Sequence, residues 1–269
     1  MDAASGAWAE TPGRQTLRKT AAIGIAAAAA VLLLLCVFIN DSGYIFILSE
    51  VFHATGISVL IYKLTKDRSC AGLSLKSQEL TALFLSLRLF FNYRMSFDIH
   101  GVLDIATLIT TLWVIYMIRV ILKSSYMEDE DSFPLKYLVM ACALLALFAH
   151  PKSSDNLVNR LMFAFGCNLE TVAIMPQLRL MHNTKIVESL AAYYVFSLGV
   201  TRFLNTAHWI IQVVSSHGTI LFGLVYGIWP AVVFISEIVQ TLMLGDFCYY
   251  YIKSIVKGHS VLRLPSDSV

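Results

Sequence analysis

Long apolar runs, separated by short polar segments, occupy most of the chain. They lie near residues 21–39, 44–62, 79–93, 101–122, 135–149, 157–178, 189–214 and 219–252. A helix needs about 20 apolar residues to cross the hydrocarbon core of a bilayer. The pattern therefore predicts an all-α polytopic membrane protein with eight spans.

The runs are not uniform in length. The third and fifth are short for a span, and the last is too long for one and contains Pro230. Residues 219–229 form either an interfacial stub on the non-cytosolic side or the upper half of a kinked helix. Both alternatives leave one final span after Pro230.

The first run follows a basic segment that contains Arg14, Arg18 and Lys19. A cleaved signal peptide has an apolar region of about 7–15 residues and ends in small residues. This run is longer and ends in Val37, Phe38 and Ile39, which are not small. We therefore expect a retained anchor.

Lysine and arginine in the short loops predict the orientation. Residues 14–19 and 63–76 are basic, whereas the loops at 40–43, 92–101, 151–156 and 215–218 are poorer in positive charge, although they hold Arg94 and Lys152. This distribution predicts that both termini are cytosolic. The acidic segment 128–131 does not conflict with it, because acidic residues contribute little to the rule.

Composition agrees with a membrane protein. Apolar residues make up 57% of the chain and charged residues 14%, against about a quarter charged in soluble domains. The net charge of +2 gives no indication of a nucleic-acid partner. No catalytic motif is present, so we expect no enzyme. Five scattered cysteines form no disulfide or metal pattern, and we expect no cofactor: Cys36, Cys70, Cys142, Cys167 and Cys248.

Several ionisable residues fall inside the predicted spans. Arg88, Arg202 and Glu170 lie well within their runs, and Glu50 and His53 share one helical face. Such residues are costly in a bilayer and are candidates for function. We expect them to converge on a polar cavity open to the non-cytosolic side.

Structural interpretations stay open for the same residues. Arg88 is also compatible with snorkelling to the membrane surface. Arg202 is also compatible with a structural ion pair to Glu170 or Asp246, and His53 with a hydrogen-bonded core histidine. The last run carries two further acids that we interpret as structural charges: Glu237 and Asp246.

A weak internal repeat accompanies these charges, because residues 86–92 resemble residues 199–205. Without the first anchor, seven helices divide as three, one and three. Two parallel triple-helix repeats joined by a linker helix form a known transporter architecture.

Four sequence blocks in the same order carry a family resemblance. They are residues 68–78 (RSCAGLSLKSQ), 169–178 (LETVAIMPQL, with the Pro-Gln pair of PQ-loop proteins), 194–202 and 239–258. In these blocks the chain resembles the KDEL/HDEL receptors, the ER lumen protein-retaining receptors, over residues 44–258.

The resemblance implies a seven-helix core like that of PQ-loop sugar transporters. It also implies a lumenal pocket that captures the C-terminal tetrapeptide of escaped ER proteins at the acidic pH of the Golgi and releases it in the ER. Lumenal proteins with such signals and cytosolic vesicle coat machinery are the implied partners. The expected domains are a cytosolic segment (1–20), an extra anchor with a short loop (21–43), the receptor-like core (44–258) and a cytosolic tail (259–269).

Site roles follow from the same resemblance. Arg88 matches the arginine that holds the ligand's terminal carboxylate, and Arg202 and Glu170 match an interior charged pair. His53 matches a proposed pH-sensing histidine, and Glu50 an acid three residues before it.

The chain also departs from the family pattern at six pocket positions. Phe46 and Gln212 replace arginines, Thr201 and Asn205 replace tyrosines, Phe163 replaces a tryptophan, and Arg160 replaces an acid. A charge-assisted hydrogen bond from an arginine contributes about 1.5–3 kcal/mol. The replacement of two arginines therefore predicts tetrapeptide binding that is about a hundredfold weaker or more.

Three functions remain open at this point. The first is a retrieval receptor for C-terminal ER signals in the ER and Golgi membranes. The second is a small-solute transporter on a PQ-loop scaffold. The third is a non-binding relative that acts in traffic through cytosolic partners.

Overall fold

The structure is a computed structural model that describes residues 42–95, 99–152, 156–184, 186–215, 228–256 and 262–263. The predicted anchor at 21–39 and most of the predicted tail lie outside the described residues. The domain boundaries proposed at residues 20, 43 and 258 therefore stay predictions.

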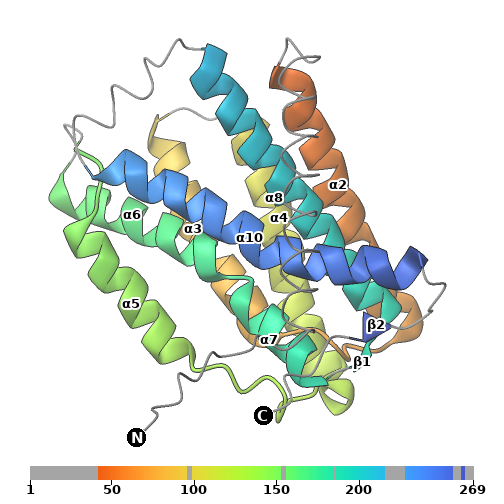
Figure 1. The fold of residues 1–269 in the computed structure, drawn as a ribbon. Helices are drawn as coiled ribbons and strands as arrows, with labels where there is room; N and C mark the ends of the chain where they lie inside the picture. Colours follow the sequence, from red (N-terminus) through yellow and green to blue (C-terminus); the bar gives the residue numbers. More distant parts are fainter. Residues whose placement is uncertain are drawn as a thin grey trace, which may run out of the picture.

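In its described residues, each apolar run from residue 44 onward forms mainly helix, which confirms the all-α class (Figure 1). The α-helices are α2 (Ser42–Tyr62), α3 (Leu75–Met95), α4 (Ile99–Tyr116), α5 (Leu135–Phe148), α6 (Leu157–Val172), α7 (Met175–Thr184), α8 (Ser189–Ser215) and α10 (Trp229–Val256). Short elements extend or connect them: η1 (Lys63–Asp67), η2 (Met117–Ile121), η3 (Lys123–Ser125) and the paired strands β1 (Ile186–Val187) and β2 (Leu262–Arg263).

Four helical segments of the described chain are long and apolar enough to cross a bilayer: Tyr44–Asp67, Gly101–Ile121, Leu157–Thr184 and Ala231–Val256. Helix α5 is apolar but shorter. Helices α3 and α8 are long enough, and their packing against the spanning helices places them in the same bundle. The protein is therefore a multi-pass membrane protein.

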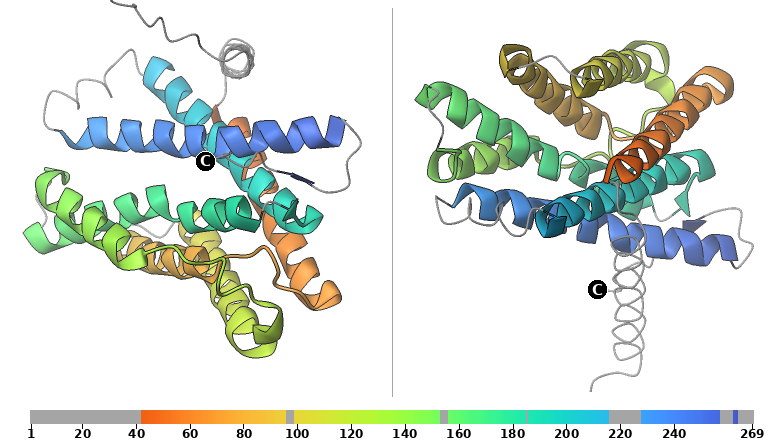
Figure 2. Two further views of the ribbon diagram at one scale, coloured as in Figure 1. Left: turned by 60° about the horizontal axis from the view of Figure 1, so that its bottom comes forward. Right: turned by 90° about the horizontal axis from the view of Figure 1, so that it is seen from above.

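Helix packing follows the predicted repeat. Helix α3 packs against α4 and α6, and α8 packs against α10 and α2, so a pairing in one half has a counterpart in the other. Helices α6 and α7 form one interrupted helix that corresponds to α2. Helix α5 links the halves and packs on α6. In both views of Figure 2, α10 lies on one side of the molecule and α3 and α4 on the other.

Proline marks two helix starts. Helix α10 begins at Trp229, so Pro230 lies in its first turn, where a missing N–H has no cost. The last apolar run is therefore not one helix through Pro230, and residues 219–227 lie outside the described part. Pro176 likewise lies in the first turn of α7, directly after the break that ends α6.

Helices α2 and α8 approach closely at Gly56. A Cβ atom there would lie 2.9 Å from Ser197 Cβ, so a larger residue would push the two helices apart. Small residues at such crossings permit the close backbone packing on which membrane helices depend.

Two of the resemblance blocks meet in the fold. Gln177 Nε2 donates to Gly72 O at 2.7 Å, and Gln177 Oε1 accepts from Ser74 N at 2.8 Å. Gly72 takes φ of +75°, which favours glycine. Ser77 Oγ also donates to Ala173 O at 2.6 Å. The Pro-Gln pair thus starts α7 and binds the backbone that leads into α3.

A buried acid completes this loop network. Asp131 is 2% exposed and accepts from Ser74 Oγ at 2.9 Å and from the Tyr126 hydroxyl at 2.7 Å. Burial and the neighbouring carboxylate raise the pKa of Tyr126, so its phenol stays a donor. The acidic segment that follows α4 therefore has a structural role in joining the loops.

Candidate functional site

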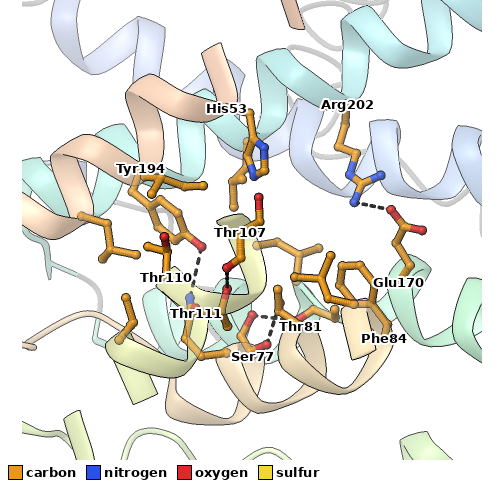
Figure 3. A pocket seen from close by; sticks show the side chains of 18 of the residues that line it. His53, Ser77, Thr81, Phe84, Thr107, Thr110, Thr111, Glu170, Tyr194 and Arg202 are labelled. Atoms are coloured by element: carbon orange, nitrogen blue, oxygen red, sulfur yellow. Dashed lines mark hydrogen bonds and ion pairs between the residues drawn. The ribbon is translucent and has the colours of Figure 1, made fainter. Parts of the chain in front are cut away.

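A single carboxylate oxygen joins the two predicted arginines. Glu170 Oε1, on α6, accepts from Arg88 Nη1 of α3 and from Arg202 Nη2 of α8, both at 3.0 Å. The Glu170 side chain is 18% exposed. Figure 3 shows Arg202 and Glu170 pointing toward each other across the cavity. Among the described residues, Asp246 forms no ion pair, so Glu170 rather than Asp246 is the partner of Arg202.

Arg88 has a second acidic partner. Its Nε donates to Asp104 Oδ2 at 2.9 Å, and its Nη2 donates to Asp104 Oδ1, which forms a bidentate pair between α3 and α4. The guanidinium also lies 5.5 Å from the centre of the Phe84 ring. Two carboxylates hold Arg88 inside the bundle, which argues against the snorkelling interpretation.

Asp104 was missed at the sequence level. It lies within the apolar run at 101–122, so the cost of a charge inside the membrane marks it as a functional candidate too. Its side chain is 11% exposed. The charge cluster therefore contains one more acid than predicted.

Two cavities, each lined by both polar and apolar side chains, meet at this cluster. The wider one has a volume of about 260 Å³ and the narrower one about 110 Å³. Both are lined by His53, Arg88, Thr107, Glu170, Leu198 and Arg202. The wider one adds Phe46, Glu50, Leu103, Asp104, Thr201 and Asn205. Of the predicted site, the structure thus brings together Arg88, Arg202, Glu170, His53 and Glu50.

The narrower cavity continues from the cluster between hydroxyl and amide side chains. In Figure 3 the His53 ring points into this space, with Tyr194 on one side and the Arg202–Glu170 pair on the other. Its polar lining includes Ser77, Gln78, Thr81, Thr110, Thr111 and Gln240. Gln78 Nε2 donates to the Tyr194 hydroxyl at 3.1 Å. The helices therefore enclose a cavity lined by polar as well as apolar side chains.

The residues at the two tyrosine positions join α2 to α8. Ser49 Oγ donates to Asn205 Oδ1 at 2.6 Å, and Thr201 Oγ1 donates to Ser49 O at 3.3 Å. Both Thr201 and Asn205 also line the wider cavity. Thr201 and Asn205 are smaller than tyrosine and therefore fill less of the cavity, and they form hydrogen bonds between α2 and α8.

The other departures lie around the same region. Phe46 lines the wider cavity and its ring centre lies 6.1 Å from that of His208. The Phe163 ring centre lies 6.0 Å from that of Trp229. Arg160 lies in the first turn of α6, and its Nε is buried. The side chain of Gln212 lies outside the described part.

The two acids of α10 do not line the cavities. Asp246 is at an exposed position. Glu237 is partly buried, and its Oε2 has no hydrogen-bond partner among the described residues. A structural role for these two charges stays a prediction.

A family model described as ER lumen protein retaining receptor matches residues 69–212, more than half of the chain. The chain belongs to this family. The match spans the loop network, Arg88, Asp104, Glu170 and Arg202. The resemblance inferred from the four sequence blocks is thereby confirmed.

Curated relatives extend the match to most of the chain. An ER lumen protein-retaining receptor of Drosophila melanogaster is 33% identical over 221 residues, which cover 81% of this chain and 96% of the relative. One of Petunia hybrida is 31% identical, with 81% and 96% covered. One of Dictyostelium discoideum is 29% identical, with 80% and 96% covered. The chain thus spans nearly the whole length of these receptors.

Proposed function

We propose that this family member is a receptor of ER and Golgi membranes that recognises C-terminal ER retention signals of the KDEL or HDEL type and supports their pH-dependent retrieval. Lumenal proteins with such signals are its ligands, and cytosolic vesicle coat machinery is its partner in transport. Two observations support the proposal. The relatives carry the name of retaining receptors, and the fold holds two arginines at a polar cavity.

The arginine pair is the observation that carries the proposal. A peptide that ends in Glu-Leu carries a side-chain and a terminal carboxylate. Guanidinium groups bind carboxylates through two parallel hydrogen bonds and keep their charge when partly buried. Arg202 is 23% exposed, lines both cavities and, among the described residues, forms its ion pair through Nη2 with Glu170. It thus has donors left for a ligand.

The proposed dependence on pH rests on two ionisable residues that line the wider cavity. Protonation of His53 adds a positive charge to the cavity, and protonation of Glu50 removes a negative one. Both changes strengthen the attraction of an anionic peptide, so its affinity rises as the pH falls.

A binding titration tests the proposal. The purified full-length protein is titrated with a peptide ending in KDEL or HDEL at about pH 6 and about pH 7.4. The matched control is the same peptide with a C-terminal amide, which lacks the terminal carboxylate. We expect tighter binding at the lower pH and weaker binding of the amide. Absence of peptide binding at both pH values would contradict the proposal.

A small-solute transporter is the second candidate. The observation that favours it is the narrower cavity, which continues beyond the Arg88–Glu170–Arg202 cluster with a polar lining between the two repeats. Reconstituted vesicles that accumulate a sugar or an amino acid faster than protein-free vesicles would support it. Peptide binding without any solute uptake would exclude it.

A further inference from the structure

A guanidinium has two edges that can bind a carboxylate in the bidentate mode, Nε with Nη2 and Nη1 with Nη2. At Arg88, Asp104 occupies the first edge, and Glu170 already accepts from one nitrogen of the second. The edge formed by Nε and Nη2 donates to the two oxygens of Asp104. The remaining nitrogen, Nη1, donates to Glu170. A terminal carboxylate that binds a guanidinium in the bidentate mode needs such an edge.

We propose that Asp104 is an internal competitor for the ligand's carboxylate, so that a carboxylate takes the Nε–Nη2 edge of Arg88 only by displacing Asp104. This inference rests on the proposed function and adds a residue that determines specificity. Asp104 acts through Arg88, on which the family resemblance places the ligand's terminal carboxylate.

The position of Asp104 suits this role. It lies on α4 and lines the wider cavity, and its side chain is 11% exposed. Glu170 bridges two arginines and holds the helices together, whereas the ion pair of Asp104 within the described part of the chain is with Arg88. The side chain of Asp104 can therefore leave its partner without breaking the Arg88–Glu170–Arg202 cluster.

The charges of the wider cavity point the same way. Its lining holds three acids (Glu50, Asp104 and Glu170) against two arginines (Arg88 and Arg202). An incoming carboxylate adds a further negative charge to a lining that already has more acids than arginines. Asp104 thus lowers the affinity of the cavity for anionic ligands. Without the charge of Asp104, the lining holds as many arginines as acids.

The test compares wild type with Asp104→Asn, which keeps the shape and removes the charge. The probes are an acetylated peptide ending in KDEL and the same peptide with a C-terminal amide, titrated at about pH 6. We expect Asp104→Asn to bind the carboxylate peptide about tenfold tighter or more, the equivalent of one charge-assisted hydrogen bond. The affinity for the amide peptide should change far less.

Two further variants test whether the gain in affinity comes from Asp104 acting on Arg88 rather than from the loss of any negative charge. Asp246→Asn removes an acid at an exposed position of α10, outside both cavities, and should leave affinity at the wild-type value. Arg88→Ala combined with Asp104→Asn should abolish the gain. If Asp104→Asn is not recovered as a folded protein, Asp104→Ser takes its place, and it should show the same gain in affinity for the carboxylate peptide.

The outcomes distinguish this inference from the proposed function. If wild type binds the peptide and the Asp104 variants bind it no tighter, the competitor role is refuted and the receptor function stands. If wild type fails to bind and Asp104→Asn binds, the competitor role stands and the wild-type receptor function is refuted. Absence of binding in all proteins refutes both.

Discussion

Glu170→Gln is the most direct test of the charge cluster. The substitution keeps the size of the side chain and an oxygen acceptor but removes the charge that Arg88 and Arg202 share. We expect it to lower the stability of the folded protein, because both arginines then lie beside a neutral group.

The magnitude follows from the hydrogen bonds. A hydrogen bond to a charged group contributes about 1.5–3 kcal/mol and a neutral one about 0.5–1.5 kcal/mol. Each of the two bonds is therefore weakened by about 1–1.5 kcal/mol. Water reaches the arginine side chains, which are 36% and 23% exposed, and Arg88 keeps Asp104. We expect a decrease near the lower end, about 2 kcal/mol in total.

Thermal unfolding of the detergent-purified protein measures the effect. A decrease of about 1 kcal/mol lowers the melting temperature of a chain of this size by about 2–4 °C, so the expected change is about 4–8 °C. Glu237→Gln is the matched control, because Glu237 Oε2 is buried without a hydrogen-bond partner among the described residues. Its melting temperature should stay the same or rise. The reasoning fails if Glu170→Gln melts with wild type, or if Glu237→Gln is destabilised as much.

Two further predictions concern the loop network. Cys70 is fully buried, and burial raises the pKa of its thiol. A maleimide should therefore label Cys70 far more slowly than the cysteine introduced by Asp67→Cys at an exposed position. Equal labelling rates would contradict the burial of Cys70. Gln177→Ala removes both hydrogen bonds to Gly72 and Ser74 and should cost about 2 kcal/mol or more; an unchanged melting temperature would show that the network does not stabilise the fold.

The helices from residue 42 onward were predictable because their signal is local. Runs of apolar residues near the length of a bilayer determine where most of the helices lie, and the described helices other than α7 fall on those runs. The start of α10 at Trp229 was less accessible. Pro230 indicates an interruption of the last apolar run but is also compatible with a kinked helix, and only the backbone shows that helix begins at Trp229.

Most members of the site were predictable, but Asp104 was missed, and the partner of Arg202 was left open between Glu170 and Asp246. Arg88, Arg202 and Glu170 stand out as charges in apolar runs, and the structure brings them together. Which carboxylate meets which arginine depends on the rotation of each helix, which a sequence does not give. Gln177 shows the same limit, because its partner Ser74 lies 103 residues away.

The repeated architecture explains why the two arginines differ. Arg88 on α3 and Arg202 on α8 lie in the repeated segments 86–92 and 199–205, and both donate to Glu170. In each repeat, the next helix that the structure describes carries an acid: Asp104 on α4 and Glu237 on α10. Asp104 forms an ion pair with Arg88. Glu237 and Arg202 are both described residues, and they form no ion pair with each other. Among the described residues, Arg88 therefore has two acidic partners, whereas Arg202 has Glu170 alone.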